Sequence, residues 1–450
     1  MLLVRGNKSD EFMRIAQFTP GAGDNIYCEN CLRDAALVRA FRKLGHEVLM
    51  IPLYLPLRVD GAEQLSNAPI FFGGINVYLQ QQSAIFRKTP RWIDRIFDMR
   101  KLLQWASGRS GVVDAHVLGK TTISMLEGED GHQVKELERL VNWLSEEENK
   151  PDIVCLSNAL LAGMAGRIKQ KTGVPVVCML QDEDQFLDDL TAPYNKQAWE
   201  ILSERARGID TFIAVSYYYA DVMKERLKLE DSQVHIVYPG IELERYKPAE
   251  AKPEIPTIGF LSQMSPGKGL DILVEAFIVL KRKEGLKNTK LYIAGRHGEK
   301  ERAFIESIER RLSENGLTED VQIMSNFDHK EKVEFLQKLS VLSVPEKHQS
   351  AYGLYLIESL ATGVPVVEPA TGVFTELLEK TGGGLLYEPN DAIKLAETIE
   401  KLLLDTEHAE RLGEQGRLSV IEKFNIEKTS DEMASIFMKT IKIFSEKNHA

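Results

Sequence analysis

Short apolar segments rich in β-branched residues alternate with longer helical patterns along this chain of 450 residues. Such alternation is typical of parallel sheets whose two faces are covered by helices. In the first half, strands are expected at residues 15–18, 48–55, 153–156, 176–180 and 212–215. The pattern restarts with expected strands at 258–261, 291–294, 321–324, 341–344 and 365–367. The sequence therefore predicts an α/β protein with two doubly wound halves.

A proline-rich segment separates the two halves. Residues 237–256 carry four prolines and mixed charge, as an interdomain linker would. We therefore expect an N-terminal extension over 1–12, a first domain over 13–236, a second domain over 257–424 and a helical tail over 425–450. If the two domains face each other, they leave a deep cleft lined by the carboxyl ends of both sheets, where ligands of doubly wound folds usually bind.

Composition excludes several classes of protein. Hydrophobic residues make up 43% of the chain and charged residues 27%, as in soluble globular proteins. The net charge of −11 argues against a dedicated nucleic-acid binder, because the phosphate backbone requires a basic surface. No apolar run reaches the roughly 18 residues of a membrane span, and the N-terminus lacks a signal-peptide pattern. Four cysteines indicate a reducing compartment, so the cytoplasm is the expected location.

The segment 341–369 contains the most informative candidate site. It predicts a buried strand, a loop, a helix that opens near Gly353 and a second strand. The start of such a helix, with the backbone of Tyr352, Gly353 and Leu354, presents N–H groups and a positive dipole end that suit a phosphate. Glu358 lies further along the same helix, where its carboxylate could accept hydrogen bonds from the ribose of a bound nucleotide.

This block resembles the donor-binding signature of the retaining glycosyltransferases of family 4, which have the GT-B fold. The family's pattern is a Glu, seven residues and a second Glu, which correspond here to Ser350 and Glu358. The small residues and the strand that follow are matched by Ser359, Ala361, Gly363 and Pro365 to Val367. The resemblance implies two Rossmann-like domains, the first for an acceptor and the second for a nucleotide sugar. It also implies a C-terminal helix that crosses back to the first domain.

A second donor element follows the strand expected at 258–261. Lys268 begins a Lys-Gly-Leu-Asp sequence, and the resemblance implies that it neutralises the diphosphate as a mobile charge. Family members carry an Arg five residues earlier, where this chain has Gln263, which can hydrogen-bond a phosphate but brings no charge. Four polar residues at expected strand ends could compensate for the departures at Gln263 and Ser350: Glu346, Lys347, His348 and Arg296. Alternatively, each is simply an exposed loop residue.

The first domain offers further candidates. Gly21 and Gly23 lie in a loop between the first expected strand and a helix expected over 27–43, where they could bring the backbone close to a diphosphate or an acceptor. Many family members place a His at the end of a first-domain strand, facing the donor sugar, and Gln181 occupies that place here. Gln can contact a sugar hydroxyl but cannot act as an acid or base at neutral pH.

Three other features have competing interpretations. Asp182-x-Asp184 could bind a metal, but acidic runs are usually solvated and GT-B enzymes do not usually need one, so no metal site is predicted. Cys28-x-x-Cys31 could be a redox or zinc motif, or a pair of small half-buried helix residues. The segment from Phe86 to Arg109 predicts a basic amphipathic helix. It could make a peripheral contact with the inner face of a membrane, or pack on the domain core.

Together with the resemblance, these residues predict transfer of a sugar from a UDP-, GDP- or ADP-sugar, with retention at the anomeric carbon. The acceptor would be a glycan, a lipid-linked molecule or a small molecule, and neither a cofactor nor a nucleic-acid partner is expected. The expected catalytic residues are Lys268, Gln263, Ser350 and Gln181. Because Gln263 and Ser350 depart from the family pattern, a weakened or inactive GT-B protein that binds nucleotide or glycan is an alternative. A GT-B sugar-nucleotide epimerase is another.

Overall fold

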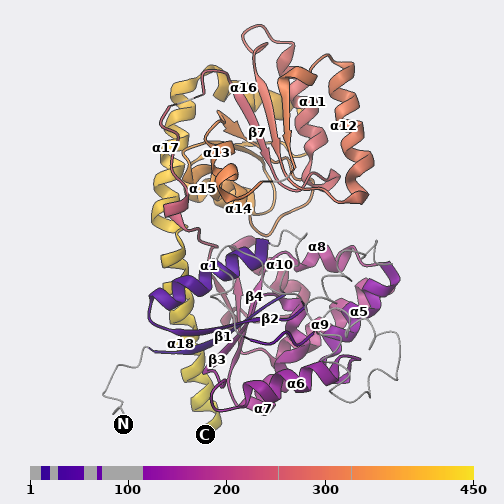
Figure 1. The fold of residues 1–450 in the computed structure, drawn as a ribbon, viewed down its shortest axis with the longest axis vertical. Coiled ribbons are helices and arrows are strands. Elements are labelled where there is room, and N and C mark those ends of the chain that lie inside the picture. The colour runs from indigo at the N-terminus through magenta and orange to yellow at the C-terminus, as the bar shows by residue number, and fades with distance from the viewer. Residues whose placement is uncertain are drawn as a thin grey trace. The chain divides into compact units, whose positions relative to one another are not determined.

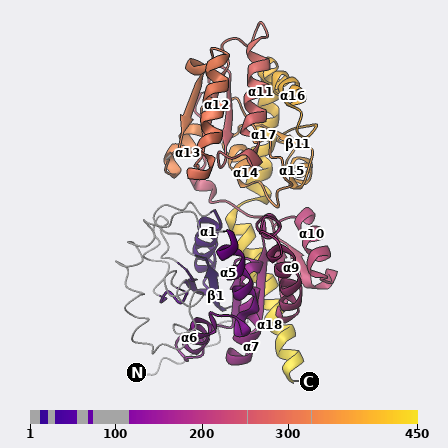
Figure 2. The ribbon, with the colours of Figure 1, turned by 90° about the vertical axis from the view of Figure 1, so that its right-hand side faces the viewer.

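The computed structural model describes residues 12–20, 29–54, 68–72, 115–251, 253–325 and 327–449. The chain forms two compact units. Unit 1 spans Met1–Val215, Tyr219–Tyr238 and Thr429–Ala450, and unit 2 spans Ser216–Tyr218 and Pro239–Lys428. The ribbon shows a sheet with helices packed against it in each unit (Figure 1, Figure 2).

The described residues of unit 1 form a parallel sheet in the order β2-β1-β3-β4-β5-β6. The strands are β1 (Arg14–Thr19), β2 (Glu47–Pro52), β3 (Ile153–Leu156), β4 (Val176–Leu180), β5 (Thr211–Ala214) and β6 (Val234–Ile236). Every residue of β3, β4 and β5 is buried, as expected of strands that are covered on both faces. β1 pairs with β2 on one side and with β3 on the other, so the strand order reverses between β1 and β3.

Helices of amphipathic sequence pack on the sheet of unit 1. They are α1 (Glu29–Lys43), α5 (Ala115–Glu127), α6 (Val134–Leu144), α7 (Ala165–Thr172), α8 (Glu183–Asp188), α9 (Tyr194–Arg205) and α10 (Tyr217–Leu227). In α6 the buried apolar residues Leu137, Leu140, Val141 and Leu144 recur every three or four positions, which places them on one face of the helix. The N-terminal end of α10 departs from this unit, because Ser216–Tyr218 belongs to unit 2.

The last helix of the chain, α18 (Ile426–His449), completes unit 1 from Thr429 onward. Phe437 is fully buried, and its ring lies 5.6 Å from the ring of Phe41 on α1. Near the far end of α18, the hydroxyls of Thr440 and Thr211 lie 2.9 Å apart. The C-terminal helix therefore returns to the first domain, as expected (Figure 1).

Unit 2 is also built on a parallel sheet, whose order is β12-β11-β10-β7-β8-β9 among the residues described. The strands are β7 (Thr257–Leu261), β8 (Lys290–Ala294), β9 (Val321–Met324), β10 (Val341–Leu342), β11 (Val366–Pro369) and β12 (Gly384–Tyr387). β7 is the first strand of this unit along the chain and lies between β8 and β10. This is the Rossmann strand order, which reverses between β7 and β10.

The helices of unit 2 cover this sheet. They are α11 (Leu270–Lys281), α12 (Arg302–Glu314), α13 (His329–Leu336), α14 (Leu354–Ala361), α15 (Val373–Thr381), α16 (Ala392–Leu404) and α17 (Thr406–Lys423). One buried cluster joins the sheet to α11, α12 and α16, with Phe260 of β7 and Phe277 of α11 among its members. Phe260 and Phe277 are both fully buried. The apolar pattern that predicts strands and helices in the sequence thus forms this core.

The two parallel sheets confirm the predicted α/β fold of two Rossmann-like domains. Each of the ten expected strands overlaps an observed strand, whereas β6 and β12 were not predicted. The segment 237–256 is not separate from the units: Val237 and Tyr238 belong to unit 1, and the chain from Pro239 belongs to unit 2. Within the described ranges, none of the helices has the length and apolar character that crossing a membrane requires.

Candidate functional site

Two loops of unit 2 meet at the point where its strand order reverses. One follows β7 and the other follows β10, and doubly wound folds bind ligands at such a point. The backbone N–H of Lys347 donates to the carbonyl of Gly267, at 2.9 Å. Gly269 has φ +70°, and a Cβ atom there would lie 1.8 Å from the carbonyl oxygen of Pro345. Glycine is therefore required for the two loops to pack this closely.

Lys268 and Ser350 contact the same carboxylate at this junction. Lys268 ends a short helical turn (Pro266–Lys268), and its Nζ lies 2.8 Å from Oε2 of Glu346. The Ser350 hydroxyl donates a hydrogen bond to the same Oε2 atom. The Glu346 side chain is 3% exposed, whereas the Lys268 side chain is 25% exposed. Two residues predicted for the donor site are thus brought together by Glu346, which the sequence indicated only as one of several loop residues.

A second carboxyl group lies next to Glu346. Glu368 is fully buried in β11, where it accepts a hydrogen bond from Tyr355 Oη at 3.1 Å. Burial raises the pKa of Glu368 well above its usual range, and the nearby charge of Glu346 raises it further. Glu346, in contrast, pairs with Lys268.

Helix α14 begins a few residues after Ser350. Its N-cap is Gly353, and Leu354 is its first residue, slightly later than the sequence indicated. Gly353 is buried, and Tyr352 and Leu354 are half-buried. The positive end of the helix dipole therefore lies on the same loop as Ser350 and Glu346. A helix start and a lysine at one strand end provide the donors that a phosphate group requires.

Glu358 lies inside a buried network. It is 5% exposed, and its Oε1 atom accepts a hydrogen bond from Tyr246 Oη at 2.5 Å. Oε1 also forms an ion pair with Lys332 of α13, whose side chain is 8% exposed. The ring of His329 packs edge-on against Tyr246, with centroids 5.0 Å apart. Sequence reasoning found Glu358 but missed Lys332 and Tyr246, because no motif links these distant positions.

Gln263 and Arg296 lie in neighbouring loops at the same edge of the sheet. Gln263 is exposed in the loop after β7, and Arg296 is half-buried in the loop after β8. The N–H of Met264 donates to the carbonyl of Arg296 at 2.9 Å, so the two loops are joined through the backbone. Both predicted residues therefore lie on loops of the same edge as Lys268.

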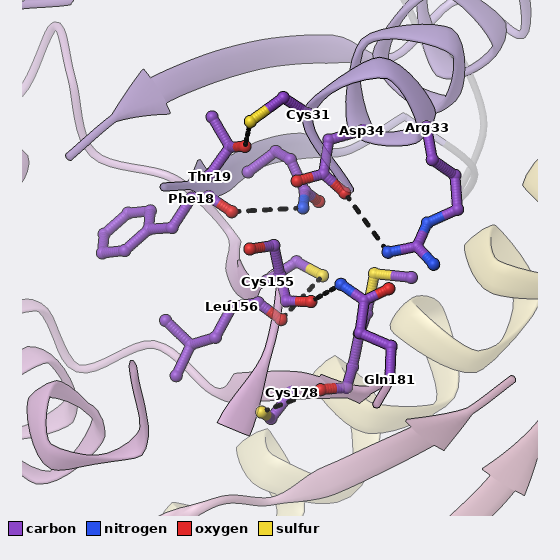
Figure 3. A network of polar contacts seen from close by, with 12 residues as sticks. Phe18, Thr19, Cys31, Arg33, Asp34, Cys155, Leu156, Cys178 and Gln181 are labelled. Carbon is purple, nitrogen blue, oxygen red and sulfur yellow. Dashed lines mark hydrogen bonds and ion pairs between the residues drawn. The ribbon is translucent and has the colours of Figure 1, made fainter. Parts of the chain in front are cut away.

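Unit 1 has a polar cluster where its own strand order reverses. Figure 3 shows Arg33 and Asp34 of α1, which form an ion pair, in the same network as Gln181, which follows β4. Gln181 is buried and donates to the carbonyl of Ser157, while its own Oε1 has no hydrogen-bond partner among the described residues. Burial raises the pKa of Asp34 to about 7, against the opposing charge of Arg33. Gln181 therefore lies at a ligand-binding position of a doubly wound sheet.

Glu183 lies directly after this cluster, at the start of α8. Its carboxylate accepts hydrogen bonds from the backbone N–H groups of Ala159, at 2.8 Å, and Gln181, at 2.6 Å. Tyr219 Oη donates to it as well, at 2.8 Å. Burial nevertheless raises the pKa of Glu183 to about 7. These hydrogen bonds hold the backbone of Gln181 in place, which sequence reasoning did not indicate.

Several predicted features receive no structural test. Gly21, Gly23, Cys28 and the segment from Phe86 to Arg109 lie outside the described residues. Cys31 is buried and disulfide-bonded, whereas Cys155 and Cys178 are buried free thiols. Within the described part of the chain, no group of three His, Cys, Asp or Glu side chains could hold a metal ion.

The family models match most of the described fold. A model for "Glycosyl transferases group 1" matches residues 243–419, and a model for "Glycosyltransferase Family 4" matches residues 123–245. The D-inositol 3-phosphate glycosyltransferase 1 of Catenulispora acidiphila is 23% identical, over 82% of this chain and 91% of that protein. The MMP alpha-(1->4)-mannosyltransferase of Mycolicibacterium hassiacum is 24% identical, over 54% of this chain and 57% of that protein. Several further relatives are matched over about half of their length.

Solved structures with the same fold cover almost the whole chain. Anabaena Alr3699/HepE, in complex with UDP and glucose, has a TM-score of 0.68 and 13% identity, covering 95% of this chain and 100% of that one. Sucrose-phosphate synthase from Thermosynechococcus elongatus has a TM-score of 0.69 and 17% identity, covering 95% of this chain and 98% of that one. At these identities the similarity concerns the fold.

Proposed function

Because this chain belongs to the GT-B glycosyltransferases of group 1 and family 4, we propose that it transfers a sugar from a nucleotide diphosphate donor to an acceptor hydroxyl. The observation that carries the proposal is the meeting of Lys268, Ser350 and the start of α14 at the strand-order reversal of unit 2. A cation and a helix N-terminus at such a position suit a diphosphate.

We assign the donor contacts as follows. Lys268 would neutralise the diphosphate, with additional hydrogen bonds from Gln263 and the backbone of Gly353 and Leu354. Tyr352 and Arg296 would line the same site. Glu358 would hold the ribose, and its contacts with Tyr246 and Lys332 support this role by fixing the rotamer of its carboxylate. The donor is a UDP-, GDP- or ADP-sugar in this proposal, with UDP the first to test because Anabaena HepE was solved with it.

The chemistry would rest on stabilising the leaving diphosphate. As the nucleotide departs, negative charge grows on its terminal phosphate, and a preorganised ammonium such as Lys268 lowers the energy of that state. We propose that the sugar keeps its anomeric configuration, with Ser350 and Gln181 near the sugar. The acceptor would be a glycan, a lipid-linked molecule or a small molecule. The D-inositol 3-phosphate glycosyltransferase relatives support the last class.

Calorimetric titration tests the donor site directly. UDP, GDP, ADP and their common sugar conjugates are titrated without metal and then with Mg²⁺. We expect micromolar binding to one base, weakened at least tenfold in Lys268→Ala, since a charge-assisted contact contributes about 1.5–3 kcal/mol. Lys347→Ala is the matched control, because the Lys347 ammonium pairs with Asp271 in the first turn of α11, at 2.7 Å.

The alternatives give different results in the same experiment. If no nucleotide binds to the wild-type protein, the donor site is disabled and a glycan-binding protein without transfer activity is the better interpretation. Conversion of the nucleotide sugar without an acceptor would instead indicate an epimerase. NMR of the anomeric signal of the product distinguishes retention from inversion.

A further inference from the structure

Glu346 is the one carboxylate in the described part of the chain that touches both Lys268 and Ser350. We propose that it binds the sugar of the donor, by accepting hydrogen bonds from sugar hydroxyls, and thereby determines which nucleotide sugars are bound. This inference rests on the proposed function of the same site. It assigns the recognition of the sugar to a residue that is separate from those that hold the diphosphate.

The position of Glu346 is fixed by its surroundings. Its backbone N–H donates to the carbonyl of Val344 at 2.7 Å, in a tight turn directly after β10. The next residue, Lys347, is joined to Gly267 through the backbone. On the side chain, Ser350 Oγ and Lys268 Nζ share the Oε2 atom. The carboxylate is therefore oriented before any ligand arrives, as specific recognition requires.

Burial of the Glu346 carboxylate lowers the stability of the fold, so its presence here points to a role in binding. The Glu346 side chain is 3% exposed, and desolvating a carboxylate costs several kcal/mol, which one ion pair offsets only in part. Burial and the nearby charge of Glu346 raise the pKa of the adjacent Glu368 well above its usual range. Of these two neighbouring carboxyl groups, Glu346 is the one that pairs with the proposed diphosphate-binding residue, Lys268.

The chemistry of a nucleotide sugar fits this arrangement. The sugar is bonded directly to the terminal phosphate, so a phosphate held by Lys268 brings the sugar into the region next to it. Glu346 Oε2 lies 2.8 Å from Lys268 Nζ and is therefore within that region. A carboxylate attracts hydroxyl groups, which donate hydrogen bonds, and repels phosphate, which offers only acceptors at neutral pH. Glu346 is thus suited to the sugar and unsuited to the diphosphate.

The test compares the affinity for a nucleoside diphosphate with the affinity for its sugar conjugate. UDP and UDP-glucose, and the corresponding GDP-mannose and ADP-glucose pairs, are titrated into wild-type protein and into Glu346→Gln. We expect the substitution to weaken binding of the sugar conjugate at least tenfold, as for loss of a charged hydrogen bond. Binding of the diphosphate alone should stay within twofold or become tighter, because a repulsive charge is removed.

Glu368→Gln is the matched control. It makes the same chemical change next to Glu346, but at a fully buried residue of β11 that contacts Tyr355, so the ratio of the two affinities should stay within twofold of wild type. If Glu346→Gln does not fold, Glu346→Asp gives a second test. It keeps the charge but withdraws the carboxylate by one methylene, and we expect weaker binding of the sugar conjugate, with binding of the diphosphate kept within twofold.

The other outcomes contradict the inference. Equal weakening of diphosphate and sugar conjugate in Glu346→Gln would mean that Glu346 acts only by positioning Lys268. An unchanged ratio of the two affinities would mean that the sugar does not contact Glu346. If the wild-type protein binds no nucleotide, the proposed function and this inference are both overturned. This outcome is seen with the wild-type protein alone, so it is not confused with an effect of Glu346→Gln.

Discussion

Two buried carboxyl groups of unit 1, Asp34 and Glu183, titrate near neutral pH for the same physical reason. Burial disfavours the charged form and raises the pKa of each to about 7. The charge of Arg33 opposes the shift at Asp34, and hydrogen bonds from Ala159 and Tyr219 oppose it at Glu183. Between pH 4 and 7 the folded protein therefore binds protons that the unfolded chain releases, so its free energy of unfolding falls as the pH rises.

Asp34→Asn should flatten this pH dependence. The variant cannot titrate at this position, so the loss of stability from pH 4 to pH 7 should decrease by up to about 4 kcal/mol, from roughly three pKa units at about 1.4 kcal/mol each. Urea unfolding at several pH values measures the slope of the free energy of unfolding against pH. Asp231→Asn is the control, because Lys224 lowers the pKa of that exposed carboxylate and its titration has the opposite sign. A slope unchanged in Asp34→Asn would contradict the assignment.

At the residue scale, the sequence singled out groups that lie in motifs, but not their contacts with distant residues. Lys268 and Glu358 stand out because each lies in a short run of characteristic residues, and their roles stay predictions. Glu346 is 78 residues from Lys268, and Lys332 is 26 residues from Glu358. Such pairs meet only because parallel strands bring their carboxyl ends to one edge of a sheet, and a single sequence does not encode which loop side chains then touch.

Among the structural elements, the turn that ends at Gly269 has the strictest requirement. Its φ of +70° and its contact with Pro345 both exclude a side chain. Gly316 has a similar φ of +68°, but a Cβ there would meet no atom within 4 Å. The two glycines therefore separate the effect of backbone conformation from the effect of contact.

Gly269→Ala should destabilise the protein more than Gly316→Ala. The shared left-handed conformation costs about 1–2 kcal/mol in either variant. At Gly269 the loops after β7 and β10 must also move apart, which should additionally weaken nucleotide binding. Urea unfolding and calorimetric titration of both variants measure these effects. Equal losses of stability, with nucleotide affinity kept in Gly269→Ala, would show that the contact with Pro345 is not needed.

At the element scale, prediction succeeded where strands are long and apolar. β4 and β7 are continuous buried runs, which the hydrophobic pattern identifies directly. β6 has only three residues and includes a half-buried His235, and β12 opens with Gly384. Neither has the pattern of a buried strand, and both are defined by pairing with a neighbour instead.

At the scale of the whole molecule, unit 1 is assembled from distant parts of the chain. Phe437 of α18 packs on Phe41 of α1, and Phe437→Ala should lower the stability of this unit by about 3–5 kcal/mol. Hydrogen exchange should show faster exchange in β3 and β4 and no change in β7 and β8. Ile443→Ala, on an exposed position of the same helix, should leave all four strands protected. Faster exchange in β7 and β8 as well would mean that the two units unfold together.

The return of α18 to unit 1 has a consequence for synthesis on the ribosome. The apolar surface around Phe41 is made before unit 2, but the helix that covers it is made after unit 2. The remaining part of unit 1 and all of unit 2 are translated in between, which takes tens of seconds at about 5–20 residues per second. A nascent chain that pauses before Thr429 would thus carry an uncovered hydrophobic face, a natural target for chaperones that bind during translation.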